Sequence, residues 1–160
     1  MAAEKEKIIM KPIEIKVIGK VKKSSEEICS LFLNTERWSD FKGYSILPGI
    51  KAAEFTVKTS NLVGSRIKVQ NTDGSSHIEE IIEWDIKNRI ALKFQDFSAP
   101  LNKFATYFIE VWKFNAIENG TKIERSMTMY PKGFLGWIIL LPISQLMKKA
   151  FEKHSIEHKD

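Results

Sequence analysis

The 160-residue sequence predicts an α+β fold in which a curved, seven-stranded antiparallel sheet wraps around one long C-terminal helix, with two short helices after the first strand. Three observations predict it: an alternating apolar and charged stretch near the start, six strand-like segments separated by turn signals, and helical periodicity at the end. Strands joined by hairpins form antiparallel sheets. A curved sheet also needs a helix to cover its inner face.

The first strand and the two short helices come before residue 42. "KPIEIKVIGKVKKS", residues 11–24, alternates isoleucine and valine with lysine and glutamate. Such alternation is typical of a strand with one buried face. Ser24 then stands three residues before Glu27, a capping box that begins a short helix. "NTERWSDF", residues 34–41, predicts a second short helix.

Turn signals divide the middle of the chain into strands. Asp73-Gly74 and Asn119-Gly120 are pairs that tolerate the positive φ of tight hairpin turns. The predicted strands are 45–58, 63–71, 76–84, 89–97, 104–117 and 121–130.

The C-terminal segment predicts a helix that lies on the sheet. Phe134 to Met147 is largely apolar, but it is shorter than the ~20 residues that span a bilayer. After Pro142, apolar side chains recur at helical spacing opposite lysines, which indicates an amphipathic helix. Pro142 cannot donate a backbone hydrogen bond, so it predicts a kink or a new helix start.

The segment 134–143 is apolar on all sides, more than a helix on a sheet requires. It is interpreted as a cavity portal packed by loops, a dimer contact, or a patch for transient contact with a membrane surface. We favour the portal.

Hairpin geometry predicts which side chains face inward. Pairing Glu118 with Thr121 places Glu110 and Trp112 on the inner face, and a five-residue turn from Asp85 places Glu80 there. The predicted cavity residues are Trp38, Phe41, Ile82, Trp84, Leu92, Phe94, Phe108, Glu110, Trp112, Arg125, Met127, Met129, Trp137 and Leu141.

Glu80 and Glu110 stand out as carboxylates on largely apolar faces. A buried carboxylate must be protonated, paired, or in contact with water or a ligand. The two are therefore candidate catalytic or head-group-binding residues, unless the register slips or they lie at a solvent-exposed strand end. Arg125 is a candidate partner, although its predicted position makes the reach to Glu110 long.

No metal or cofactor site is expected. His154 and His158 lie four residues apart, but two ligands are too few for a usual metal site. Cys29 and His77 could in principle join an acid in a nucleophilic triad, yet a cysteine among apolar residues of a capped helix is more often packing.

Composition narrows the class of protein. The chain is 43% hydrophobic and 28% charged, with a net charge of +5, and its scattered lysines show no nucleic-acid-binding signature. A charged N-terminus without an apolar run argues against secretion, and the single cysteine suits the cytoplasm. We expect one domain over 1–160 with a flexible segment at 1–11, as a monomer or weak homodimer.

The order of elements resembles the helix-grip fold of the START-like (SRPBCC) superfamily. "GTKIERSMTMYPKGFLGWIILLPISQLMKKAFEK", residues 120–153, is similar to the closing strand and helix of the polyketide cyclase/dehydrase and lipid-transport group. "VGSRIKV" and "EEIIEWDIKNRIALKF" resemble the middle strands of the same group. The likeness implies a hydrophobic cavity between sheet and helix, but no catalytic signature that can be assigned to named residues.

Three functions follow as hypotheses. The first is a non-enzymatic carrier or sensor of a hydrophobic small molecule, such as a lipid or polyketide-like compound, with no cofactor. The second is a cyclase/dehydratase-type enzyme that uses Glu80 or Glu110 as an acid or base. The third is a protein-interaction module that docks through its apolar C-terminal segment.

Overall fold

The computed structural model of the chain describes residues 10–157. Most of the predicted flexible segment 1–11, and His158, lie outside this range. In chain order the elements are β1 (Ile13–Val21), α1 (Ser25–Leu33), the 3-10 helix η1 (Thr35–Asp40), β2 (Ile50–Val57), β3 (Arg66–Asn71), β4 (Ser76–Asp85), β5 (Arg89–Gln95), the 3-10 helix η2 (Leu101–Lys103), β6 (Ala105–Ile117), β7 (Gly120–Pro131) and α2 (Gly133–Glu157).

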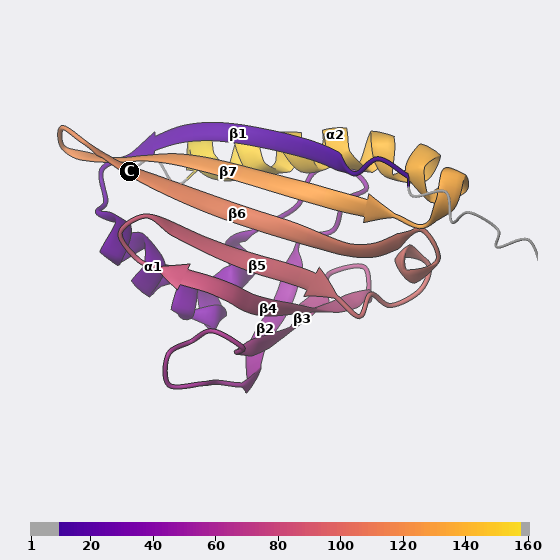
Figure 1. Ribbon diagram of the computed structural model, residues 1–160, viewed down its shortest axis with the longest axis horizontal. Coiled ribbons are helices and arrows are strands. Elements are labelled where there is room, and N and C mark those ends of the chain that lie inside the picture. Colours follow the sequence, from indigo (N-terminus) through magenta and orange to yellow (C-terminus); the bar gives the residue numbers. More distant parts are fainter. Residues whose placement is uncertain (1–9, 158–160) are drawn as a thin grey trace, which may run out of the picture.

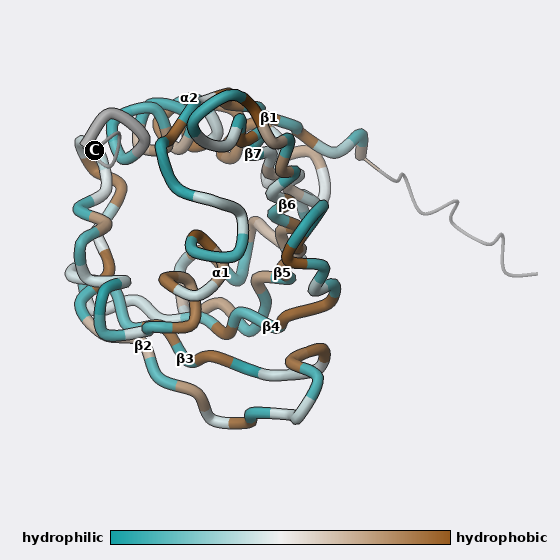
Figure 2. Tube along the Cα trace, turned by 90° about the vertical axis from the view of Figure 1, so that its left-hand side faces the viewer, coloured by the Kyte–Doolittle hydropathy of each residue, from teal (hydrophilic) through white to brown (hydrophobic). Residues whose placement is uncertain are grey.

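The strands form one seven-stranded sheet in the order β1-β7-β6-β5-β4-β3-β2, and every neighbouring pair is antiparallel. The sheet curls so that β1 and β7 lie beneath α2 while β2 and β3 lie on the opposite side (Figures 1 and 2). The predicted α+β fold class, with a seven-stranded sheet and a long C-terminal helix, is confirmed.

The helix α2 packs on the end of the sheet formed by β1 and β7. Leu140 and Phe151 of α2 are buried in one apolar cluster with Ile15 of β1 and with Met127 and Met129 of β7. Core packing between α2 and this end of the sheet therefore adjoins the concave side, and Phe151 belongs to both the cluster and the lining of the pocket described below.

A second apolar cluster lies under α1. Cys29 of this helix is buried with Ile90 of β5 and Phe114 of β6, and half-buried Trp84 and Trp112 pack against them. The Ser24 side chain accepts a hydrogen bond from the Glu27 backbone N–H, so the predicted cap begins this helix.

The predicted strand 45–58 starts too early, because β2 begins at Ile50. Gly43 and Ser45 have positive φ, and Tyr44 pairs with Leu47 in an isolated bridge. A Cβ at Gly43 would collide with the Leu47 carbonyl oxygen. This tight turn uses the residues before Ile50, which the apolar pattern alone assigned to the strand.

The predicted register of the last hairpin is wrong by two residues. Ile117 pairs with Gly120, so the turn consists of Glu118 and Asn119, which has positive φ. Glu110 consequently lies opposite Met127 instead of Met129. Since side chains alternate with a period of two, this even shift leaves each residue on the predicted face.

The helix α2 runs through Pro142 without ending, so no new helix starts there. Among the described residues, Gly133–His154 is long and apolar enough to cross a membrane by length and composition. The same stretch buries Leu140, Ala150 and Phe151 inside the protein, contacts that a membrane-spanning arrangement would lose.

Packing of α2 on the sheet predicts a sharp contrast between two adjacent leucines. Leu140 is fully buried whereas Leu141 is 37% exposed. Leu140→Ala should lower the free energy of unfolding by about 2–5 kcal/mol, because it leaves a cavity in the core. Leu141→Ala is the matched control, with a smaller expected loss of about 1 kcal/mol, because its partly exposed side chain leaves no enclosed cavity. Urea unfolding measures both, and equal losses would contradict this packing.

Candidate functional site

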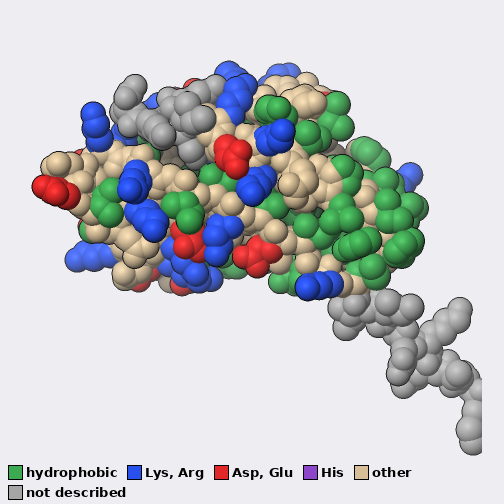
Figure 3. All heavy atoms as spheres, turned by 90° about the horizontal axis from the view of Figure 1, so that it is seen from above, with side chains coloured by type: hydrophobic (Ala, Val, Ile, Leu, Met, Phe, Trp, Pro, Cys, Tyr) green, Lys and Arg blue, Asp and Glu red, His purple; other side chains and the backbone are tan. Residues whose placement is uncertain are grey.

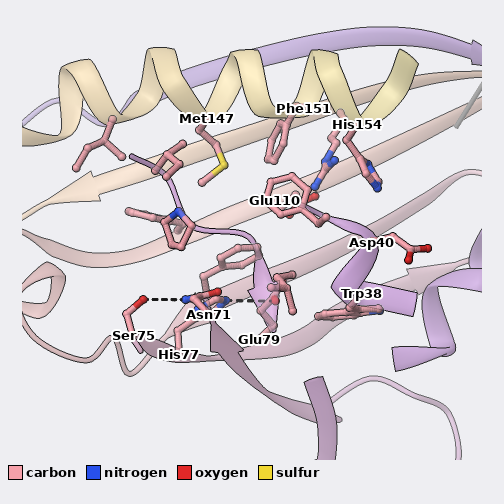
Figure 4. A pocket seen from close by; sticks show the side chains of 18 of the residues that line it. Trp38, Asp40, Asn71, Ser75, His77, Glu79, Glu110, Met147, Phe151 and His154 are labelled. Atoms are coloured by element: carbon pink, nitrogen blue, oxygen red, sulfur yellow. Dashed lines mark hydrogen bonds and ion pairs between the residues drawn. The ribbon is translucent and has the colours of Figure 1, made fainter. Parts of the chain in front are cut away.

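A cavity of about 770 Å³ lies between the concave face of the sheet, α2 and the segment around η1. This volume falls within the range of about 300–1,000 Å³ that small-molecule sites occupy. Most of the lining surface is apolar, although about a third of the lining residues have polar side chains, and Figure 4 shows Asn71, Ser75, His77 and Glu79 close together among them.

One stripe of α2 forms a wall of the cavity. Ile139, Ile143, Met147 and Phe151 all line it, at intervals of four residues, which places them on one face of a helix. Sequence reasoning did not assign these four to the cavity, although their helical spacing is a signal that could have found them.

A β-bulge in β4 changes which carboxylate faces inward. Trp84 pairs with Ile90 as predicted, but the register shifts between Ile81 and Glu83, so that Glu79 pairs with Phe94. A bulge inserts one unpaired residue and reverses the faces beyond it. Glu79 therefore lines the cavity, and the prediction that Glu80 faces inward is wrong.

Glu80 lies on the outer face, where its Oε1 accepts a hydrogen bond from Arg66 Nε at 3.0 Å. Ile82, at the bulge itself, is 38% exposed. Neither side chain is part of the cavity lining, so the catalytic role considered for Glu80 has no geometric basis.

Glu110 is buried in the cavity wall and bound by two donors. Arg125 Nε lies 2.6 Å from its Oε1, and Trp112 Nε1 lies 2.5 Å from the same atom. The predicted long reach from Arg125 is absent, because the true register places Arg125 opposite Trp112, two residues from Glu110. The Arg125 guanidinium also lies 3.6 Å from the centre of the Phe151 ring. This side of the cavity thus holds a fixed ion pair against aromatic rings.

Glu79 has a different environment. His77 Nε2 lies 3.3 Å from its Oε2, and the His77 ring stacks on Phe94 with centroids 5.2 Å apart. Burial raises the pKa of Glu79, because a carboxylate loses its hydration there; His77, through its hydrogen bond and charge, and the more distant Arg125 oppose this rise, whereas Glu110 adds to it. Burial thus favours the protonated form of Glu79.

A row of small polar side chains continues from His77 along the adjoining strand ends. Asn71 Nδ2 donates to Ser75 Oγ at 3.1 Å, and the Ser76 backbone N–H donates to Ser98 Oγ at 2.9 Å. These four residues line the cavity. The predicted Asp73-Gly74 turn brings three of them together, but no pattern in the sequence orients them inward.

The structure places half of the predicted cavity residues in the lining. These are the aromatic and charged side chains Trp38, Phe41, Phe94, Phe108, Glu110, Trp112 and Arg125.

The other predicted residues are elsewhere. Met127 and Met129 are fully buried beneath α2, and Leu92 is fully buried in the sheet. Trp84 packs against the cluster under α1. Three more lie at the surface or near it: Ile82, Leu141, and Trp137, whose ring stacks on that of Phe134.

Cys29 and the histidines provide no second site. Burial, followed by the charges of Glu26 and Asp85, raises the pKa of the Cys29 thiol to about 12, so a reactive thiolate is suppressed. The His154 ring packs edge-on against Phe41. Among residues 10–157, no cluster of three or more metal-ligating side chains occurs.

Comparison with known proteins gives a consistent picture of the fold. No protein-family profile and no curated protein sequence matches the chain. Norcoclaurine synthase from Thalictrum flavum, solved with dopamine and hydroxybenzaldehyde, is similar in structure, with a TM-score of 0.64 at 15% identity over 96% of this chain and 92% of that one.

Two further structures show the same likeness. A protein from Thermus thermophilus has a TM-score of 0.65 at 15% identity, covering 92% of this chain and all of the other. Major latex-like protein 151 from Panax ginseng has a TM-score of 0.61 at 12% identity, covering 93% and 99%. The chain therefore has the fold of these structures, and it is the helix-grip fold that its sequence resemblance predicted.

Proposed function

We propose that this protein binds a mainly apolar small molecule in the cavity and carries or senses it in the cytoplasm. The observation that supports this most strongly is the space of about 770 Å³ lined largely by apolar side chains. Burial of apolar ligand surface there stabilises a complex by about 25 cal/mol per Å². The norcoclaurine synthase complex with dopamine and hydroxybenzaldehyde is a precedent for small aromatic ligands in a protein of this fold.

The polar groups of the cavity suit a ligand with one or two polar functions. The Glu110–Arg125 pair presents a fixed dipole, and Glu79 with His77 can donate or accept a hydrogen bond. A few convergent polar groups in an apolar pocket orient a ligand and make binding specific. An entirely nonpolar guest would leave these groups without partners in the ligand, so we infer an amphipathic ligand.

Native mass spectrometry of protein purified from its own source tests the proposal. A co-purifying amphipathic molecule in stoichiometric amount is expected, and tandem mass spectrometry would identify its class. Protein that carries no such molecule, and that fails to bind apolar probes, would contradict the proposal.

Filling the cavity should weaken the binding of an apolar probe. Ile139 lines the cavity, whereas its neighbour Ile138 is 43% exposed on the outer side of α2. Ile139→Trp should weaken binding of the fluorescent probe N-phenyl-1-naphthylamine by about tenfold or more, because the indole occupies space needed by the guest. Ile138→Trp is the matched control and should bind as the natural chain does. Equal binding by both variants would place the probe outside the cavity.

An acid–base enzyme of the cyclase/dehydratase type is the second candidate, and Glu79 is the observation that favours it. A buried carboxyl group with a raised pKa beside a histidine can give and take a proton. Glu110 is less suited to this role, because Arg125 and Trp112 both donate to the same oxygen.

The two candidates differ in the expected effect of Glu79→Gln. For a carrier, the co-purified ligand should remain unchanged when incubated with either protein, and its binding should persist. For an enzyme, the natural chain should convert the ligand, and Glu79→Gln should abolish conversion, as liquid chromatography with mass spectrometry would detect. Glu80→Gln, on the outer face, is the control and should match the natural chain.

The raised pKa of Glu79 also predicts how stability depends on pH. The folded protein holds the Glu79 proton more tightly than the unfolded chain does. The contribution of this proton to the free energy of unfolding is therefore fully present below about pH 4.3, the ordinary pKa of glutamate, and is lost as pH rises through the folded-state pKa. Glu79→Gln stays neutral, so it should gain stability relative to the natural chain over that rise. Urea unfolding at several pH values measures the difference. A difference that is independent of pH, or the same trend in Glu80→Gln, would contradict the assignment.

A further inference from the structure

The first half of α2 has three distinct faces. Gly136, Leu140 and Ser144 are buried, Ile139 and Ile143 line the cavity, and the third face is apolar yet exposed. We call this third face the α2 apolar patch, and its members are Phe134 (65% exposed), Leu135 (62%), Ile138 (43%) and Leu141 (37%).

The patch lies at one end of the molecule, away from the α1 end. Figure 3 shows apolar side chains gathered at the end where α2 begins. The half-buried Trp137 stacks on Phe134, with ring centroids 6.2 Å apart and planes 22° apart. Gly136 allows α2 to lie directly against the Phe104 carbonyl, where a Cβ would collide. The helix start is therefore anchored to the loop that carries η2, and the patch is a fixed surface.

The chain segment that contains the patch carries charges of one sign. From Ser126 to Phe151 the sequence contains Lys132, Lys148 and Lys149 and no aspartate or glutamate. Lys132 precedes the helix by one residue, and its Nζ donates to the Asn102 carbonyl at 2.6 Å. That bond holds the ammonium group beside the helix start without neutralising it, and Lys103 follows in the same loop.

We propose that the α2 apolar patch docks the protein on membranes that contain anionic lipids. Exposed aliphatic and aromatic side chains on a helix surface enter the boundary between headgroups and acyl chains, and tryptophan favours that depth. Lysines at the rim pair with anionic headgroups, each contributing about tenfold or less to partitioning. The protein binds the surface through one helix face and does not span the bilayer. This function does not depend on the cavity being occupied.

A second copy of the chain suits the patch less well. A two-fold contact would place the patch and its flanking lysines against the same surface of the other copy, and residues 126–151 offer no carboxylate to pair with them. Four exposed side chains are also few beside the roughly 20–30 residues a side of a standard interface. An anionic lipid surface offers acyl chains to the apolar side chains of the patch and negative headgroups to the flanking lysines.

Vesicle sedimentation tests the proposal with the full chain. The natural protein should pellet with vesicles of phosphatidylcholine mixed with phosphatidylglycerol and much less with phosphatidylcholine alone, and high salt should release it. The double variant Phe134→Ser/Leu135→Ser should partition about tenfold less, because it loses the two most exposed apolar side chains of the patch. Ile18→Ser, which removes a 54% exposed isoleucine from β1, is the control and should bind as the natural chain does.

Two charge-reversal variants distinguish a local effect of Lys132 at the patch from an effect of the protein's net charge. Lys132→Glu should lower partitioning by about tenfold, whereas Lys87→Glu, in the β4–β5 turn at the opposite end of the molecule, changes net charge equally and should have little effect.

Natural protein that stays in solution with anionic vesicles at low salt would overturn the proposal. Concentration-dependent dimers, seen by analytical ultracentrifugation and lost in the Phe134→Ser/Leu135→Ser variant, would also overturn it. The Ile139→Trp variant should lose probe binding in the cavity but still bind vesicles. The cavity proposal and the membrane proposal can therefore fail independently of each other.

Discussion

One helix must cover the inner face of a seven-stranded sheet, and the rest of the structure depends on this mismatch. A helix with its side chains is about 10–12 Å wide, whereas seven strands spaced about 4.8 Å apart extend over roughly 30 Å. α2 therefore covers the β1–β7 end, and α1 covers a second area near Phe114. The curled sheet leaves the remaining area facing open space, and that space is the cavity.

The cavity wall accommodates two carboxylates by different means. Glu110 accepts hydrogen bonds from Arg125 and Trp112, so its charge is balanced by a partner that cannot lose its proton. Glu79 is hydrogen-bonded to His77, and burial raises its pKa. The Glu110–Arg125 pair is held in place by its hydrogen bonds and is the polar part of its side of the cavity wall. The Glu79–His77 arrangement favours the neutral form of the Glu79 carboxyl, so the protein accommodates this group without a cationic arginine or lysine bonded to it.

The helix α2 borders the cavity on one face and the outer surface of the protein on another. The Ile139 and Ile143 side chains line the cavity, and Ile138 and Leu141, on the same turns of the helix, are exposed. A helix buried on every side would account for the apolar sequence of this segment without any surface function. The structure instead divides the segment between core, cavity and an exposed patch, so its apolar residues serve three separate faces of one helix.

The sequence by itself determined the order of elements, the hairpins and the inner face of the β6–β7 pair, because turn residues and period-two alternation are local signals. Whether an inward apolar side chain packs as core, like Met127, or lines the cavity, like Phe94, depended on where α2 lies. Only the tertiary structure decided between Glu79 and Glu80. The bulge at Ile82 arises from pairing with β5, and one unpaired residue exchanges the faces of all residues beyond it. No alternation within β4 alone reveals that exchange, because it depends on contacts with a strand elsewhere in the chain.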